Sequence, residues 1–241
     1  MIVITKCDKL SSMLYIVATP IGNLKDVTLR ALETLKEVDG IVCEDSRRTS
    51  LLLNHYEIHK PLLVLNDFNE SKMFPQIIAK LQSGQNLALV SDAGTPLISD
   101  PGYKLVRECV SQNIPIDSLP GPSSVITALT LSSLPPDKFF FLGYLPEKSG
   151  RREQVYKNIT EITKIIPATF IIFVAPFKLV KTLGEIKDTL GDIEISLAHE
   201  LTKIHQSVDL KPISLWLEIF SKQPPKGEYS LLLNLTHSLS N

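Results

Sequence analysis

Short apolar runs alternate with segments of helical spacing through the first half of this chain. Leu14–Ala18 is the first run, and Thr28–Lys36 follows it with leucines at positions 29, 32 and 35. Parallel strands need long crossovers, which are usually helices, so this alternation predicts a parallel sheet covered on both faces. The further strands that we expect are Gly40–Cys43, Leu62–Leu65, Leu87–Val90 and Ile114–Leu119, and the further helices are Ser46–Tyr56, Phe74–Leu81 and Tyr103–Val110.

The chain changes character at Pro120-Gly121-Pro122, where two prolines around a glycine predict a stiff, sharp connection. We therefore expect an N-terminal extension over 1–12, one α/β domain over 13–120 and a second α/β domain over 121–241. A helix over 124–132, capped by Ser123 or Ser124, opens the second domain. Its expected strands are Phe139–Leu145, Thr169–Val174, Ile193–His199 and Tyr229–Leu235, and its further helices are 151–163, 178–190 and 212–221.

The overall charge limits the ways in which this protein could bind nucleic acid. The 241 residues carry a net charge of −1, which argues against broad electrostatic capture of a phosphate backbone. A local basic patch stays open. Lys148, Arg151, Arg152 and Lys157 form a basic cluster that is either a solvated helix face or a grip on phosphates.

The three cysteines, at positions 7, 43 and 109, are isolated and form no CxxC motif. This usage predicts a reducing cytoplasm, with the cysteines as small apolar residues. No apolar run reaches the length of a transmembrane helix, so we expect no membrane association. The five histidines lack the spacing of zinc ligands, and we expect no metal site.

Four polar loops follow predicted strands, at 19–23, 43–47, 91–102 and 120–124. Ligands of open parallel α/β sheets bind outside the carboxyl ends of the strands, so these loops predict one composite site. None of them is a GxGxxG fingerprint or a P-loop, which removes the usual support for nicotinamide or P-loop nucleotide binding.

The longest of these loops, SDAGTPLISDPG at 91–102, is the strongest candidate for binding a ligand. Asp92 follows a strand directly, and Gly94 permits close approach of a ligand to the backbone. Thr95 offers a hydroxyl group. We expect Asp100 to cap the next helix, with Pro101 as its first residue.

The loop CEDSR at 43–47 leaves two interpretations open. Glu44 and Asp45 could supply a general base while Arg47 holds a phosphate. Alternatively, the segment is a solvated turn with an internal ion pair. We expect Ser46 to cap the helix that follows.

These loops, in this order, resemble the tetrapyrrole methylase superfamily of S-adenosylmethionine (SAM)-dependent methyltransferases. Within it, the chain is most similar to the ribosomal RNA small-subunit methyltransferase I family, which methylates the 2′-hydroxyl of a cytidine. The resemblance spans nearly the whole chain from Met13. It is based on the segments 14–53, 88–106, 119–129, 140–146, 199–203 and 224–233.

The resemblance implies a SAM cleft between two α/β domains, a cytoplasmic homodimer, and small-subunit ribosomal RNA or the 30S subunit as partner. It also implies in-line methyl transfer without a metal. The implied SAM contacts are Pro20, Ile21, Asp92, Gly94, Thr95, Ser123, Ser124, Phe173, Val174, Ala175, Leu201 and Gly227. The polar residues expected near the target hydroxyl are Glu44, Asp45, Arg47, Glu200 and Lys203, and those expected to contact RNA are Lys148, Arg151 and Arg152.

Two segments depart from the family pattern. Residues 66–70 read Asn-Asp-Phe-Asn-Glu where the family has His-Glu-His-Asn-Glu, and residues 173–178 read Phe-Val-Ala-Pro-Phe-Lys where it has Tyr-Glu-Ser-Pro-His-Arg. Both changes remove polar groups. They leave two alternatives open, a methylase of a tetrapyrrole or other small substrate on the same fold, and a SAM-binding ribosome-assembly factor with reduced catalysis.

Overall fold

The chain divides into two compact units, and the division falls between Ser123 and Ser124 rather than after Pro120. The structure is a computed structural model that describes residues 12–66 and 68–236. The expected N-terminal extension lies outside the described residues, except for Ser12.

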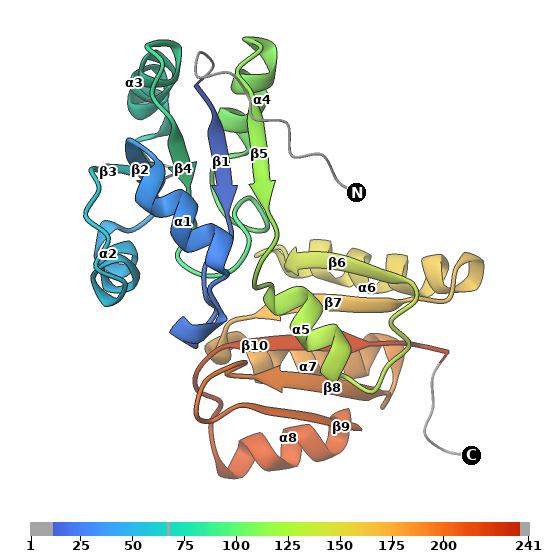
Figure 1. Cartoon of the computed structure of the whole chain (residues 1–241). Coiled ribbons are helices and arrows are strands. Elements are labelled where there is room, and N and C mark those ends of the chain that lie inside the picture. The colour runs from blue at the N-terminus through green and yellow to red at the C-terminus, as the bar shows by residue number, and fades with distance from the viewer. Residues whose placement is uncertain (1–11, 67, 237–241) are drawn as a thin grey trace, which may run out of the picture. The chain divides into compact units, whose positions relative to one another are not determined.

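The first domain is built on a five-stranded sheet in the order β3-β2-β4-β1-β5, in which all pairs are parallel (Figure 1). This confirms the parallel sheet predicted from the alternation of strands and helices. Its strands are β1 (Leu14–Val17), β2 (Gly40–Cys43), β3 (Leu62–Val64), β4 (Leu87–Leu89) and β5 (Ile116–Leu119). Its helices are η1 (Leu24–Asp26), α1 (Leu29–Glu37), α2 (Ser46–His55), α3 (Glu70–Gln82) and α4 (Tyr103–Ser111).

Both faces of this sheet are covered, because neighbouring residues of a strand enter two different apolar clusters. In β4, Leu87 and Leu89 belong to the cluster that includes α3 and α4, whereas Ala88 belongs to the cluster that includes α1 and α2. The buried strands hold the loops at their carboxyl ends in fixed positions.

The second domain contains a mixed sheet in the order β6-β7-β10-β8-β9, in which β6 and β7 are parallel and the other pairs are antiparallel. Its strands are β6 (Phe139–Tyr144), β7 (Thr169–Val174), β8 (Glu194–His199), β9 (Ser207–Pro212) and β10 (Tyr229–Leu233). Its helices are α5 (Ser124–Leu131), α6 (Ser149–Ile165), α7 (Pro176–Leu190) and α8 (Ile213–Lys222).

The sequence prediction missed β9, whose sequence SVDLKP has little apolar character. The strand forms because Ser207–Pro212 pairs along its full length with β8 at the edge of the sheet. Helix α3 also begins earlier than expected, at Glu70, and continues through Pro75.

The residues predicted to cap two helices were wrong, although α2 and α4 begin at Ser46 and Tyr103 as expected. Asp45, not Ser46, caps α2, because its carboxylate accepts a hydrogen bond from the Arg47 N–H. Helix α4 begins at Tyr103 after Gly102, so Pro101 is not its first residue and Asp100 does not cap it.

Candidate functional site

Hydrogen bonds join three of the predicted loops in the first domain. Thr19 and Gly94 exchange two backbone hydrogen bonds of 2.9 Å, which tie the loop after β1 to the loop after β4. The hydroxyl group of Thr95 donates to the Pro122 carbonyl at 3.1 Å, which adds the loop after β5. The site predicted from separate strand ends is therefore one connected structure in this domain.

A cavity of about 300 Å³ opens beside these loops. Its lining combines apolar side chains with as many polar ones, so that it offers both apolar contact and hydrogen-bonding groups to a small molecule. The lining residues are Thr19, Pro20, Leu24, Arg48, Thr49, Leu51, Leu52, Val90, Ser91 and Asp92. Pro20 and Asp92 were expected to bind the cofactor, whereas sequence reasoning missed Arg48 and the apolar residues of α2.

Asp92 lies at the centre of the polar contacts in this cavity. One carboxylate oxygen accepts the Asp45 N–H at 3.1 Å, and the other lies 3.4 Å from the Arg48 Nε. The loop after β2 is thereby joined to the loop after β4. Asp92 remains partly exposed, so its carboxylate can also receive a ligand.

Arg47 and Arg48 differ in their surroundings although they are adjacent. The Arg47 side chain is 89% exposed, and its guanidinium pairs with Asp45 at 2.6 Å. This is the internal ion pair of the simpler interpretation of the segment. The hydrogen bonds from Arg47 lower the pKa of Asp45 to about 2, which makes this carboxylate a weak base.

Asp100 packs within the long loop rather than capping a helix. Burial raises the pKa of its carboxyl group to about 6, although a hydrogen bond with Ser91 acts in the opposite direction. Ser91 also contacts the Gly94 carbonyl through its hydroxyl group, at 3.2 Å. Asp100 therefore belongs to the internal bonding of the loop that carries Asp92.

The backbone of this loop is held in unusual conformations. Leu97 and Ser99 have positive φ angles of 75° and 65°, which non-glycine residues rarely adopt. At Gly94, with φ of 83°, an added Cβ would lie 3.3 Å from the Ile21 side chain. A glycine there lets the predicted contacts Ile21 and Gly94 approach each other closely.

In the second domain, the expected site residues gather where β7 and β8 end and β10 begins, which is the edge of the sheet formed by strand ends rather than by an outer strand. Tyr229 of β10 is in register with Val174 at the end of β7 and with His199 at the end of β8. The segments that follow these strands, which contain Ala175 and Leu201, therefore lie at the edge from which β10 starts, next to Gly227. Val174 and Leu201 are buried, whereas Phe173 and Ala175 are partly exposed, and Ser124 begins α5.

Glu200 ties two loops together at this edge. Its carboxylate accepts the Glu228 N–H at 2.9 Å and the Lys203 ammonium at 3.0 Å, and Lys203 also pairs with Glu228. Burial acts to raise the pKa of Glu200, but these contacts lower it overall. An added Cβ at Gly227 would lie 2.7 Å from the Glu200 carboxylate, so the two loops meet only with a glycine there.

The basic cluster does not behave as one surface, because Arg152 is buried inside the domain. Its guanidinium binds Glu185 through two hydrogen bonds of 2.6 and 2.7 Å and also donates to the Pro146 and Glu147 carbonyls. The expectation that Arg152 contacts RNA is therefore corrected. Lys148 and Arg151 are exposed, and Lys157 pairs with Glu153 along the helix.

No group of three or more potential metal ligands occurs among residues 12–66 and 68–236. Over the same residues, no helix is both long and apolar enough to cross a membrane. Cys43 and Cys109 are free and buried, and Cys7 lies outside the described part of the chain.

The fold and the matched family model define a methylase. Residues 13–214 match the family of tetrapyrrole (corrin/porphyrin) methylases. The crystal structure of diphthine synthase superposes with a TM-score of 0.73 over 92% of this chain and 90% of its own, at 14% identity, which shows a common fold.

More similar relatives narrow the class. The ribosomal RNA small subunit methyltransferase I of Thermotoga maritima is 44% identical and aligns over 92% of this chain and 97% of its own length. That of Escherichia coli O157:H7 is 47% identical over 94% of this chain and 79% of its own, and that of Mycoplasmopsis pulmonis is 46% identical over 91% and 96%. The chain belongs to the ribosomal RNA small subunit methyltransferase I family.

Proposed function

We propose that this protein transfers a methyl group from SAM to the 2′-hydroxyl of a cytidine in small-subunit ribosomal RNA. The observation that supports this proposal most strongly is the joining of the loops after β1, β2, β4 and β5 around Asp92. The resemblance to the family is based in part on these loops, and those after β1 and β4 line a cavity of about 300 Å³ together with α2.

The residues of the cavity suit the chemistry of SAM. Pro20, Leu24 and Leu52 offer apolar surface to an adenosine, and the Asp92 carboxylate can accept hydrogen bonds from a ribose or an amino group. We propose further contacts from Gly94, Thr95 and Ser123 and, in the second domain, from Ser124, the segment 173–175, Leu201 and Gly227. SAM supplies an activated methyl group on a positively charged sulfur, so the protein needs mainly to align donor and acceptor.

A base must accept the proton of the ribose hydroxyl group, and Glu44 is the best candidate of the five polar residues. Asp45 has a pKa of about 2, and the bonds from Lys203 and the Glu228 N–H lower the pKa of Glu200. Lys203 keeps its proton, because its carboxylate partners raise its pKa although burial acts to lower it. Glu44 is partly buried and adjoins Asp45, whose N–H binds Asp92.

We further propose that the protein acts as a homodimer in the cytoplasm and meets its RNA partly through Lys148 and Arg151. Both side chains are exposed, Lys148 directly before α6 and Arg151 in its first turn. Size-exclusion chromatography with light scattering tests the dimer directly, and a monomer at micromolar concentration would refute it.

A SAM-binding assembly factor with reduced catalysis is the alternative, and one observation favours it. The segment 173–177 contains no ionisable side chain, where the family pattern that the sequence resembles has a glutamate and a histidine. Methyl transfer from labelled SAM to unmethylated small subunits separates the two functions. No incorporation, with SAM binding intact by calorimetry, would refute the enzyme.

Two substitutions test the site itself. Asp92→Ala should weaken SAM binding about tenfold or more without unfolding the protein, because a charged hydrogen-bond acceptor is lost. Glu44→Gln should leave SAM affinity unchanged and lower kcat about 100-fold, with loss of the acidic limb of the pH profile, because that limb reports protonation of the base. Unchanged SAM affinity in Asp92→Ala would refute the proposal that the Asp92 carboxylate binds SAM.

A further inference from the structure

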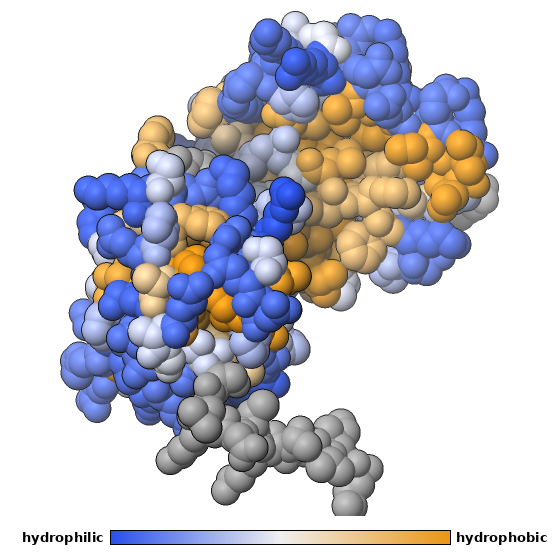
Figure 2. Space-filling model, turned by 90° about the horizontal axis from the view of Figure 1, so that it is seen from above, coloured by the Kyte–Doolittle hydropathy of each residue, from blue (hydrophilic) through white to orange (hydrophobic). Residues whose placement is uncertain are grey.

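Two exposed aromatic rings lie at one edge of the sheet in the second domain. Tyr144 is the last residue of β6 and 64% exposed, and Phe177 is the second residue of α7 and 82% exposed. Because β6 and β7 are parallel, the chain that follows each of them emerges at the same edge. On the face of this domain that Figure 2 presents, apolar residues form a broad area. Large aromatic side chains exposed at neighbouring strand ends, such as Tyr144 and Phe177, point to an interaction site of their own.

The Tyr144 ring is held in place by its neighbours. It packs edge-on against Phe173 with ring centroids 5.6 Å apart, and Phe173 packs edge-on against Phe141 at 4.8 Å. These three rings face away from the core, because Phe140 and Phe170 stack on its side of the sheet. A preformed aromatic surface loses little conformational entropy when it binds a ligand.

Basic side chains occur in the segments that carry these rings. Lys178 pairs with Glu147 and its ammonium group lies 5.5 Å from the centre of the Phe177 ring, so the start of α7 adjoins the loop after β6. Lys148 and Arg151 follow in that loop and in the first turn of α6, and neither forms an ion pair with any described residue. These two unpaired cations make this part of the surface locally positive, although the whole chain has a net charge of −1, and a positive surface attracts a polyanion.

We propose that this aromatic–cationic edge, defined as Tyr144 and Phe177 with Lys148 and Arg151, stacks unpaired bases of the RNA substrate and holds their phosphates. Aromatic faces interleaved with cations are the means by which proteins bind single-stranded nucleic acid. A surface for apolar self-association would not need unpaired cations in the loop and first helical turn that follow Tyr144. The inference rests on the proposed function, because it names the part of the chain that receives that RNA.

The test uses the full-length protein and a short single-stranded RNA of mixed sequence, with affinity read by fluorescence anisotropy. Phe177→Leu and Tyr144→Leu keep apolar bulk but remove the stacking face, and each should weaken binding about fivefold or more. Phe177→Tyr keeps an aromatic ring at this position and should bind the RNA with an affinity close to that of the original protein. SAM affinity by calorimetry should not change in any of these variants.

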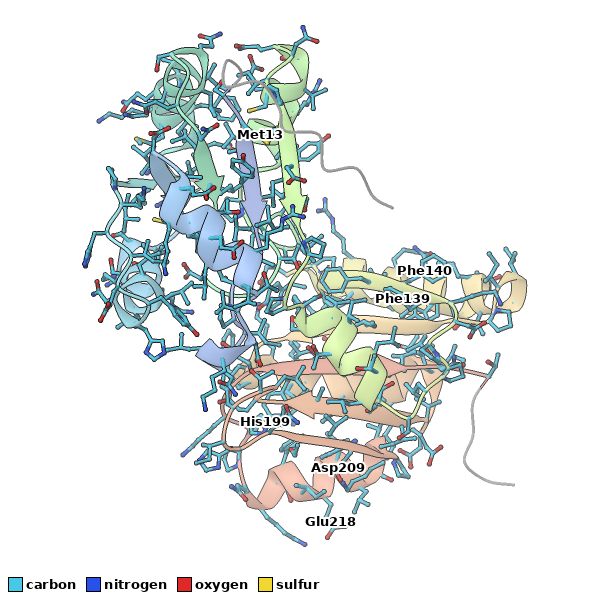
Figure 3. All side chains as sticks on the ribbon, in the orientation of Figure 1. Met13, Phe139, Phe140, His199, Asp209 and Glu218 are labelled. Atoms are coloured by element: carbon cyan, nitrogen blue, oxygen red, sulfur yellow. The ribbon has the colours of Figure 1, made fainter. Side chains whose placement is uncertain are left out.

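A matched control lies on the same strand. Phe139 is 40% exposed at the opposite end of β6, as Figure 3 shows, and Phe139→Leu should leave RNA binding unchanged. Lys148→Ala and Arg151→Ala should each reduce the slope of log affinity against log salt by about 0.7, the value per phosphate contact with a single strand.

Three outcomes would overturn the inference. The first is an RNA affinity that is unchanged in Phe177→Leu and Tyr144→Leu, and the second is an equal loss of RNA affinity in Phe139→Leu. The third is a lower molar mass of the Phe177→Leu or Tyr144→Leu variant than of the original protein in light scattering. The last would show a contact between two copies of the chain. If RNA binding depends on the rings but small subunits are not methylated, the proposed function fails and the inference stands. If small subunits are methylated but RNA binding does not depend on the rings, the inference fails and the proposed function stands.

Discussion

Arg152 stabilises the second domain from within through its ion pair with Glu185, and substitution of its side chain tests this role. Replacing it by glutamine removes two charged hydrogen bonds to Glu185 and two to the Pro146 and Glu147 carbonyls. Breaking a buried ion pair by removing one partner costs about 3–5 kcal/mol. The Glu185 side chain is 24% exposed, so water can compensate in part, and we expect a loss near the lower limit, about 3 kcal/mol.

The chain offers a selective probe for this change. Trp216 is its only tryptophan, lies buried in α8, and donates a hydrogen bond to the Ile195 carbonyl, so its fluorescence follows the unfolding of the second domain. With an m value of about 2 kcal/mol/M in urea, the Arg152→Gln midpoint should fall by about 1.5 M. Arg151→Gln is the matched control, and its midpoint should shift by less than about 0.3 M, since exposed substitutions usually change stability by under about 0.5 kcal/mol.

The result that would refute this reasoning is a normal urea midpoint in Arg152→Gln together with weakened RNA binding. Arg152 would then act on the surface, as the sequence first indicated. A fall of about 1.5 M in Arg152→Gln, with RNA affinity measured well below the transition and unchanged, would establish its internal role.

Three further predictions concern the first domain. Arg48→Ala should lower kcat/KM for methyl transfer about tenfold, since Arg48 lines the cavity beside Asp92, and Arg47→Ala should lower it less than twofold; equal effects would contradict this difference. Gly102→Ala should destabilise the domain by about 1–3 kcal/mol in circular-dichroism unfolding, because φ is +116° and the new Cβ would lie 3.0 Å from Leu89 and Leu97. Gly84→Ala is the control, with φ of +94° but open space around the new Cβ, and it should destabilise the domain less. A larger loss of stability in Gly84→Ala would be inconsistent with the packing. Burial raises the Asp100 pKa to about 6, so the folded protein favours the protonated carboxyl and loses stability as the pH rises from about 4 through 6. Asp100→Asn should therefore raise the melting temperature relative to the original protein at pH 7.5 but not at pH 4. A difference in melting temperature that does not depend on pH would argue against a buried carboxyl.

The parallel sheet of the first domain could be predicted because each strand is a short, buried apolar run and each crossover has helical spacing. In the second domain, β9 could not be predicted, since SVDLKP has no strong periodicity and becomes a strand only by pairing with β8. Local sequence does not contain the partner that provides the hydrogen bonds.

The candidate site shows the same limit at the level of single residues. The loop around Asp92 could be found from its composition and its place after a strand, but the sequence could not distinguish Arg47 from Arg48. Their directions depend on Asp45, which caps α2 and keeps Arg47 beside it, while the next position along the helix turns Arg48 toward Asp92. The same limit applies to Arg152, because only the fold shows that Glu185 lies opposite it.

The departure at 173–178 changes the kind of recognition that this edge can provide. The family pattern has glutamate and histidine there, whose hydrogen bonds depend on the groups that they meet. This chain has valine and phenylalanine instead, and Phe177 is exposed beside Lys178. Stacking accepts any base, because every base has a π-face, whereas hydrogen bonds discriminate among edges. We therefore expect affinity for RNA to be kept at this edge while its discrimination between bases is lower, which leaves the choice of the target nucleotide to the polar groups around Asp92 and to the structure of the RNA itself.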